Sequence, residues 1–359
     1  MSGTEKQDAG GTNGASGAVA DANAWTVKRL LEWLKAALAK AGVESPALCA
    51  EMLLGHVLRC DRLRLYTSTE RVATAEELAT LRGLAQRALK HEPVQYLVGT
   101  AWFYGMSLKV DRRVLIPRPC TEGLVEEAVK EAKRRNPGVK VAKVLPWKTV
   151  QLPGAVAAGG GTASAGARAN PGAAEPAPLG PEAGEGLAVL DLCTGSGCVA
   201  LACAKQLPGA EVTGTDLSAD ALAVARANAQ SLGLADRVEW LEGDLLEPVA
   251  GRTFDIVLAN PPYIPDAEWE EVPANVKQYE PTGALRGGSD GLETVGRLLD
   301  GVWRVLRPGG LVMVEVAAST IAAALERVRT GPGARGLEDA RIIRDLEGHE
   351  RFVLARRKA

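Results

Sequence analysis

The stretch FDIVLANPPY, from Phe254 to Tyr263, joins an apolar run to an asparagine, two prolines and a tyrosine. So short an apolar run fits a strand that is buried on both faces of a sheet. The prolines end that strand, because they donate no backbone hydrogen bond and fix φ. A strand that simply stops at proline is the commoner explanation of such a pattern. The alternative is a stiff corner that holds the Asn260 amide and the Tyr263 ring in place.

The sequence around this corner alternates between strand-like and helix-like segments from Leu187 onward. Such alternation predicts an α/β fold, with a parallel sheet covered by helices on both faces. A last helix and two strands, near ARIIRD and RFVLARR, complete the chain. The predicted strands are LAVLDL, EVTGTD, VEWLEGD, FDIVLAN and LVMVEVA, and the predicted helices are GCVALACAKQL, SADALAVARANAQSLG and a segment from about 291 to 306 that ends at PGG.

The sequence before Leu187 divides into parts of different composition. Residues 1–24 are rich in Gly, Ala and Ser and predict a disordered tail. Apolar residues at helical spacing over 25–92 predict a small helical domain. Within it, Thr74 followed by two glutamates is typical of a helix N-terminus. Residues 93–116 predict a β-hairpin linker.

The remaining residues, 117–359, are expected to form the α/β domain. Its first helix lies in EGLVEEAVKEAKRR, with Thr121 as the expected N-cap. An Ala/Gly/Pro-rich stretch at about 137–186 interrupts the domain. That composition cannot bury enough apolar surface to offset its ordering entropy, so we expect a disordered insert.

The composition restricts the class of protein. Hydrophobic residues make up 46% of the chain, which suffices for a core, and aromatic residues only 4%, so the core should be aliphatic. The formal net charge of −2 argues against bulk nucleic-acid binding, which needs a basic surface. The six cysteines form no CxxC pair, and no apolar run approaches the ~18 residues of a membrane span. We therefore expect a cytoplasmic protein with reduced thiols.

A glycine-rich turn in VLDLCTGSGCVAL is the candidate cofactor loop. Gly195 and Gly197 allow a ligand to approach the backbone closely, and the N-terminus of the helix that follows favours the binding of an anion. Asp216 ends the next strand, where an acid can accept hydrogen bonds from two ribose hydroxyls. Asp191 lies within the strand before the loop and could reach a ligand amino group. The loop alone is equally compatible with a dinucleotide and with S-adenosylmethionine as the ligand. A dehydrogenase has no need of NPPY, so this motif favours S-adenosylmethionine.

With these motifs in this order, the chain resembles the bacterial peptide chain release factor protein-(glutamine-N5) methyltransferases, a family of class I S-adenosylmethionine-dependent methyltransferases. The resemblance covers roughly 25–357, apart from the insert. The matching stretches are EPVQYLVGTAWFYG, LIPRPCTEGLVEEA, VLDLCTGSGCVALA, GTDLSADALAVARANA, NPPYIP, EPTGALRGGSDGL and DLEGHERFVLARR.

The resemblance implies a Rossmann-like seven-stranded sheet with a reversed last strand, a helical domain that docks the protein substrate, and S-adenosylmethionine as cofactor. It implies release factors as protein substrates; we expect no membrane or nucleic-acid partner, a monomer, and no metal. The implied cofactor residues are Cys193, Thr194, Gly195, Ser196, Gly197, Asp216, Leu245 and Asn260. The implied substrate residues are Asn260, Pro261, Pro262 and Tyr263, of which Asn260, Pro261 and Tyr263 are expected to be catalytic.

Two residues depart from the family pattern. Cys120 stands in RPCTE where an Asp is usual, which affects the hydrogen bonding of that loop. Cys193 stands at the first loop position, which is often Gly; because Cys is small, we expect this change to be harmless.

The NPPY corner suits a primary amide, whose nitrogen is a poor nucleophile. The Asn260 side-chain oxygen and the Pro261 carbonyl can each accept one N–H, and both hydrogen bonds strengthen as positive charge develops on nitrogen. Tyr263 can stack on the flat amide, and no general base is needed before attack.

Other functions remain open at this point. NPPY is shared with methyltransferases that act on N6 of adenine or on another exocyclic amine of nucleic acid, which need a base-flipping pocket. A related branch methylates a ribosomal-protein glutamine. A non-catalytic binding module with the same fold is the third alternative.

Overall fold

The computed structural model describes residues 24–136 and 186–359. The expected tail at 1–24 and insert at 137–186 therefore lie almost wholly outside the described residues. Among the described helices, none combines the length and the hydropathy that crossing a bilayer requires.

The centre of the fold is the predicted sheet, and it has seven strands. Their order is β5-β4-β3-β6-β7-β9-β8, and β9 runs antiparallel to both of its neighbours. Every residue of β3 and β6 is buried, as the short apolar runs predicted. The predicted seven-stranded sheet with its reversed last strand is thus confirmed. The strands are β3 (Ala188–Leu192), β4 (Glu211–Asp216), β5 (Val238–Glu242), β6 (Phe254–Ala259), β7 (Leu306–Glu315), β8 (Leu337–Arg344) and β9 (Glu350–Arg357).

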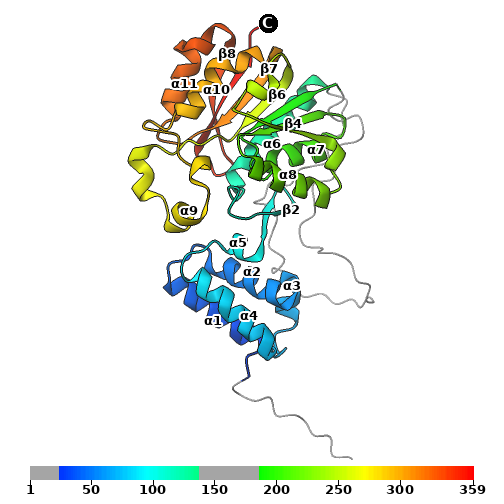
Figure 1. The fold of residues 1–359 in the computed structure, drawn as a ribbon, viewed down its shortest axis with the longest axis vertical. Coiled ribbons are helices and arrows are strands. Elements are labelled where there is room, and N and C mark those ends of the chain that lie inside the picture. The colour runs from blue at the N-terminus through cyan, green and yellow to red at the C-terminus, as the bar shows by residue number, and fades with distance from the viewer. Residues whose placement is uncertain (1–23, 137–185) are drawn as a thin grey trace, which may run out of the picture.

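Helices cover both faces of this sheet (Figure 1). One apolar cluster joins α6 (Glu122–Arg135), α7 (Cys198–Gln206) and the end of α8 (Ala219–Ser231) to one face. A second cluster joins α10 (Glu293–Gly301) and α11 (Ile321–Thr330) to the other face. The core is therefore aliphatic and double-layered, as the composition indicates.

The helix predicted over about 291–306 is shorter in the structure. It ends at Gly301, and β7 already begins at Leu306, so that the PGG at 308–310 lies within the strand. The pairing of β6 with β7 passes from Phe254–Leu306 to Ile256–Leu311, which places the extra residues of β7 in a bulge. The prediction was wrong because Pro and Gly usually end helices, whereas here a bulge accommodates them within a strand.

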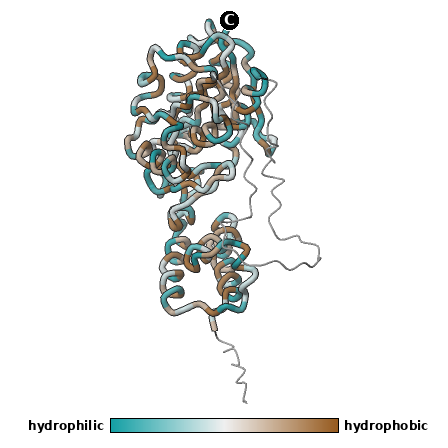
Figure 2. Tube along the Cα trace, turned by 90° about the vertical axis from the view of Figure 1, so that its right-hand side faces the viewer, coloured by the Kyte–Doolittle hydropathy of each residue, from teal (hydrophilic) through white to brown (hydrophobic). Residues whose placement is uncertain are grey.

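The helical domain is a separate bundle at one end of the molecule (Figure 2). Its helices share one apolar cluster. The Thr74 prediction is confirmed, since Thr74 and Glu77 form a reciprocal capping box at the start of the fourth helix. The helices are α1 (Val27–Lys40), α2 (Pro46–Leu58), α3 (Arg62–Thr67) and α4 (Ala75–Ala88).

The linker differs in part from the predicted hairpin over 93–116. Val94–Val98 forms a short helix, α5, and only β1 (Thr100–Phe103) and β2 (Met106–Lys109) pair as a hairpin. The hairpin packs on α8, where the Asn228 side chain bonds both the N–H and the C=O of Lys109.

A second connection runs from the helical domain to α9 (Ala274–Tyr279). The Tyr279 hydroxyl donates to the Lys90 carbonyl at 3.3 Å, and the Arg112 guanidinium lies 4.9 Å from the centre of the Tyr279 ring. Arg112 also pairs with Glu92 at 2.9 Å. The segment that follows the NPPY corner therefore touches the end of the helical bundle.

Candidate active site

Hydrogen bonds to Asp191 hold the loop after β3 in place. This buried carboxylate accepts the Thr194 hydroxyl at 2.5 Å and the Ala200 N–H at 3.0 Å. Burial raises the pKa of Asp191 to about 7, although these two hydrogen bonds oppose the shift. Asp191 thus joins the loop to the start of α7, and it also lines the cavity, so the ligand contact considered from the sequence stays a prediction.

Two backbone positions give the loop its shape. Gly197 has φ of +80°, and a Cβ there would lie 2.8 Å from the Trp240 ring. A side chain at this position would be both strained and overlapping. Cys193 also has a positive φ, +57°. The left-handed conformation disfavours any L side chain, so the backbone conformation matters at this position in addition to the small size of Cys.

Asp216, at the end of β4, is fixed against the same loop. One carboxylate oxygen accepts the Gly195 N–H at 2.8 Å, and the other accepts the Ser218 N–H at 2.9 Å. Burial raises the pKa of Asp216, and these backbone donors lower it in part. Each carboxylate oxygen has a further lone pair, so both can still accept from a ligand hydroxyl.

The loop after β5 contributes Asp244 and Leu245. Asp244 pairs with Arg297 of α10 at 2.5 Å. Leu245 has φ of +48° and lines the same cavity, where the family resemblance predicts that it flanks the adenine.

The NPPY corner is held by hydrogen bonds from outside its own strand. The Asn260 Nδ2 donates to the Thr121 hydroxyl at 3.2 Å, and the Thr121 hydroxyl in turn donates to Glu315 at 2.8 Å. The Tyr263 hydroxyl donates to the other oxygen of Glu315 at 3.1 Å. Behind the corner, a Cβ at Gly291 would lie 2.6 Å from the Tyr263 carbonyl oxygen, so only glycine allows this approach.

Thr121 does not act as the predicted helix cap. Helix α6 does begin at Glu122, but the Thr121 side chain makes no capping hydrogen bond. Its hydroxyl instead bonds Glu315 and Asn260, which are distant in the sequence, so Thr121 joins distant segments of the chain.

Residues 113–118, at the end of the linker and just beyond it, form a strap that borders the cavity. Glu280, just after α9, is 4% exposed and accepts the Ile116 N–H at 3.0 Å and the Arg118 guanidinium at 2.5 Å. The strap residues Leu115 and Arg118 line the cavity, as does Pro281. Arg118 is therefore paired in the structure and holds the strap in place.

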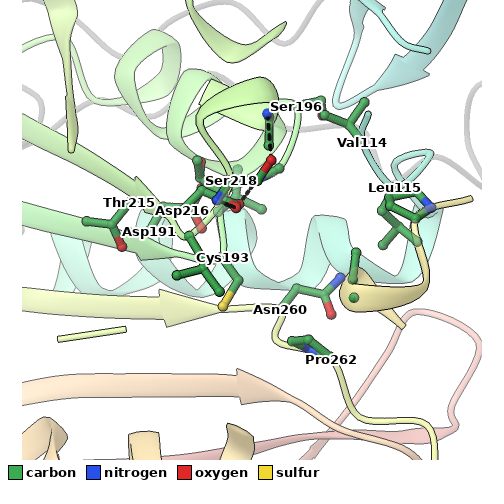
Figure 3. A pocket seen from close by; sticks show the side chains of 18 of the residues that line it. Val114, Leu115, Asp191, Cys193, Ser196, Thr215, Asp216, Ser218, Asn260 and Pro262 are labelled. Atoms are coloured by element: carbon green, nitrogen blue, oxygen red, sulfur yellow. Dashed lines mark hydrogen bonds between the residues drawn. The ribbon is translucent and has the colours of Figure 1, made fainter. Parts of the chain in front are cut away.

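These elements enclose a cavity of about 470 Å³ at the carboxyl ends of the parallel strands, where open α/β sheets bind their ligands. Figure 3 shows Asp216 and Ser218 on one side of it, Asn260 and Pro262 on another, and the Cys193 sulfur pointing toward Asn260. The predicted residues that line the cavity are Cys193, Thr194, Gly195, Ser196, Asp216, Leu245, Asn260 and Pro262. Gly197, Pro261 and Tyr263 lie next to these residues but do not line it.

The cavity suits a nucleoside-bearing cofactor. Its volume is in the range of pockets that take drug-sized ligands. It presents the Asp216 carboxylate to hydroxyl groups, and the buried Ser196 hydroxyl, which lines it, has no hydrogen-bond partner among the described residues. A buried polar atom without a partner is costly, so a ligand that satisfies it gains affinity. Within the described residues, no cluster of His, Cys, Asp and Glu could hold a metal.

Two residues of this site were not assigned a role from the sequence, Glu315 and Glu280. Glu315 is an acid within the apolar run LVMVEVA, and a charge at such a position was a usable signal, because buried carboxylates need partners. Glu280 carries no comparable signal, since it lies in a polar connection.

Comparisons with known proteins show what the chain is similar to. Residues 29–99 match a family model described as the PrmC N-terminal domain, and residues 189–279 match one described as a methyltransferase domain. A release factor glutamine methyltransferase of Rhodopirellula baltica is 38% identical over 93% of this chain and 97% of its own length. Another, from Geobacter sulfurreducens, is 36% identical over 92% of this chain and 96% of its own.

A solved structure is also similar, the release factor-specific protein-(glutamine-N5) methyltransferase of Alicyclobacillus acidocaldarius. It is 25% identical, with a TM-score of 0.35, over 70% of this chain and all of that chain.

Proposed function

Because the chain belongs to the release factor glutamine methyltransferase family, we propose that it methylates the side-chain amide nitrogen (N5) of the glutamine in the Gly-Gly-Gln motif of peptide chain release factors. The chain is a methyltransferase, and its cofactor is S-adenosylmethionine. This cofactor supplies a methyl group on a positively charged sulfur, which is already a good leaving group.

The observation that carries the proposal is the fixed orientation of Asn260 at the cavity. Thr121 occupies the amino half of the Asn260 amide, which leaves Oδ1 as its acceptor. This oxygen accepts one N–H of the substrate amide, and the Pro261 carbonyl accepts the other. Both bonds strengthen as positive charge builds on the nitrogen, so they favour the transition state.

The remaining residues position the two reactants. Asp216 binds the ribose hydroxyls, and Leu245 flanks the adenine. Tyr263 lies beside the cavity without lining it, and its hydroxyl bond to Glu315 holds the corner next to the flat amide. The strap held by Glu280 limits the access of water. Alignment to roughly 3–3.5 Å between the reacting atoms supplies much of the rate enhancement.

We also propose that residues 25–92 dock the release factor and that 117–359 form the catalytic domain. The match of residues 29–99 to an N-terminal family domain supports this division. A cytoplasmic site of action and a monomeric state belong to the same proposal.

Methyl transfer to a purified release factor tests the function. Wild-type protein with radiolabelled S-adenosylmethionine should label the release factor at the motif glutamine, as mapped by mass spectrometry. A release factor with alanine at that position is the matched substrate control. Label in DNA or ribosomal RNA, with none in the release factor, would contradict the proposal and would show that the protein is a nucleic-acid methyltransferase.

Asn260→Ala tests the role of the corner. We expect kcat to fall by about 100-fold or more, in the range found when a transition-state hydrogen-bonding group is removed, while the cofactor Kd changes by less than about fivefold. Unfolding of the variant, measured by circular dichroism, would show that Asn260 is mainly structural.

A further inference from the structure

Glu315 connects both ends of the NPPY corner, although it lies on another strand. It is the last residue of β7 and is fully buried. One oxygen accepts the Thr121 hydroxyl at 2.8 Å, and the other accepts the Tyr263 hydroxyl at 3.1 Å. The Cys120 thiol also points at the second oxygen, at 3.7 Å. This carboxylate therefore receives donors from two chain segments that border the cavity.

The hydrogen-bond directions along this chain of groups are not independent. A threonine hydroxyl has a single proton. Because Thr121 gives that proton to Glu315, it can only accept from Asn260, and Asn260 must turn its Nδ2 toward Thr121. The acceptor oxygen of Asn260 then points the other way.

A neutral group in place of the Glu315 carboxylate would remove this constraint. A carboxamide can donate to the Thr121 hydroxyl, which frees the Thr121 proton to bond the oxygen of Asn260. The Asn260 amide could then rotate by half a turn and present an N–H to the substrate amide, which is itself a donor. Two donors facing each other would abolish the productive hydrogen bond.

We propose that Glu315 is a positioning residue that fixes the orientation of the Asn260 amide through Thr121, and that it restrains Tyr263 at the other end of the corner. The inference rests on the proposed function only in that Asn260 receives the substrate amide. Glu315 is fully buried and does not line the cavity, and Thr121, which does line it, acts in this role through its bond to Asn260. Their effect on the reaction is carried by Asn260.

The test compares Thr121→Val, Thr121→Ser and Glu315→Gln. Val keeps the shape of Thr but has no hydroxyl, and Ser keeps the hydroxyl. In methylation of a release factor we expect kcat to fall about 10- to 100-fold in Thr121→Val and Glu315→Gln, as for a small misplacement of a reacting group. The KM for the release factor and the Kd for the cofactor should stay within about threefold. Thr121→Ser should recover kcat to within about threefold of wild type.

Thr213→Val is the matched control. Thr213 is 3% exposed on β4, and its hydroxyl bonds Glu239 and Arg252 away from the corner. The control should keep the wild-type kcat. Equal losses of kcat in Thr213→Val and Thr121→Val, or equal losses in Thr121→Val and Thr121→Ser, would overturn the inference, because packing would then account for the effect.

A spectroscopic readout separates this inference from the proposed function. Selective ¹⁵N labelling of asparagine gives the side-chain NH2 signal of Asn260, assigned by its absence in Asn260→Asp. The protons should exchange slowly with water in the wild type and at least about tenfold faster in Thr121→Val and Glu315→Gln. Unchanged exchange in both variants would overturn the inference even if the release factor is methylated. Faster exchange in both would support it even if the substrate were a different amide.

Discussion

Replacing Asp216 by Asn tests the assignment of the cofactor site quantitatively. In the structure both oxygens of the carboxylate accept a backbone N–H, from Gly195 and from Ser218. Asparagine has one oxygen, so one of these N–H groups would face an NH2 group. Hydrogen bonds to a charged group contribute about 1.5–3 kcal/mol, and we expect the cofactor-free variant to lose stability of that order in urea unfolding.

The larger consequence concerns cofactor affinity. We propose that each Asp216 oxygen also accepts one ribose hydroxyl, through its second lone pair. Loss of one such bond, again about 1.5–3 kcal/mol, corresponds to a rise in Kd of about 10- to 150-fold. Isothermal titration calorimetry with S-adenosylmethionine measures this change directly, at fixed pH and ionic strength.

Asp244→Asn is the control for general electrostatic effects. Asp244 lines the same cavity, but its carboxylate is paired with the half-exposed Arg297. An exposed pair of this kind contributes at most about 1 kcal/mol, so Kd should change by less than about fivefold. A Kd of Asp216→Asn within threefold of wild type, or equal losses in the two variants, would refute the placement of the ribose against Asp216.

Three further predictions concern the loop and the strap. The free energy of unfolding of Cys193→Gly should remain within about 1 kcal/mol of wild type or exceed it, because glycine removes the strain of a left-handed side-chain-bearing residue and this offsets its greater loss of backbone entropy on folding. Cys193→Val should lose more than about 1 kcal/mol in urea unfolding. Since the folded-state pKa of Asp191 is raised, its contribution to stability is present below pH 4 and is lost as pH rises to about 7. Across that window, the free energy of unfolding of wild type relative to Asp191→Asn should fall by up to roughly 4 kcal/mol. An equal pH dependence of the free energy of unfolding in both proteins would contradict this. Glu280→Gln should cost about 1.5–3 kcal/mol through its bond to Arg118 and weaken cofactor binding in calorimetry, while the exposed Glu347→Gln should change neither.

The sheet and most of the cavity were predictable because the signals for them lie in short stretches of the sequence. Strands buried on both faces read as short apolar runs, and β3 and β6 are such strands. Parallel strands place their carboxyl ends at one edge, which brought Asp216 and Asn260 to the same cavity. The Thr74 cap was equally local, because its capping box spans only the four residues from Thr74 to Glu77.

The errors arose where distant segments decide the outcome. Thr121 and Glu315 are 194 residues apart in the chain, so the local pattern around Thr121 indicated a cap and could not show its actual partner. The positive φ of Cys193 was not foreseen, because composition does not reveal the sign of φ, and the harmlessness of Cys at this position stays a prediction. The short helix Val94–Val98 lies among aromatic residues that favour strands, and the helix is closed by Gly99 at φ of +73°.

The neighbouring residues Tyr279 and Glu280 contact two different parts of the molecule. Tyr279 bonds the helical bundle, and Glu280 holds the strap that borders the cavity. A tilt of the bundle would therefore move the strap, because adjacent residues make the two contacts. If a protein bound to the bundle changed the affinity for S-adenosylmethionine through these contacts, thermodynamic linkage would require the cofactor to change the affinity for that protein by the same factor.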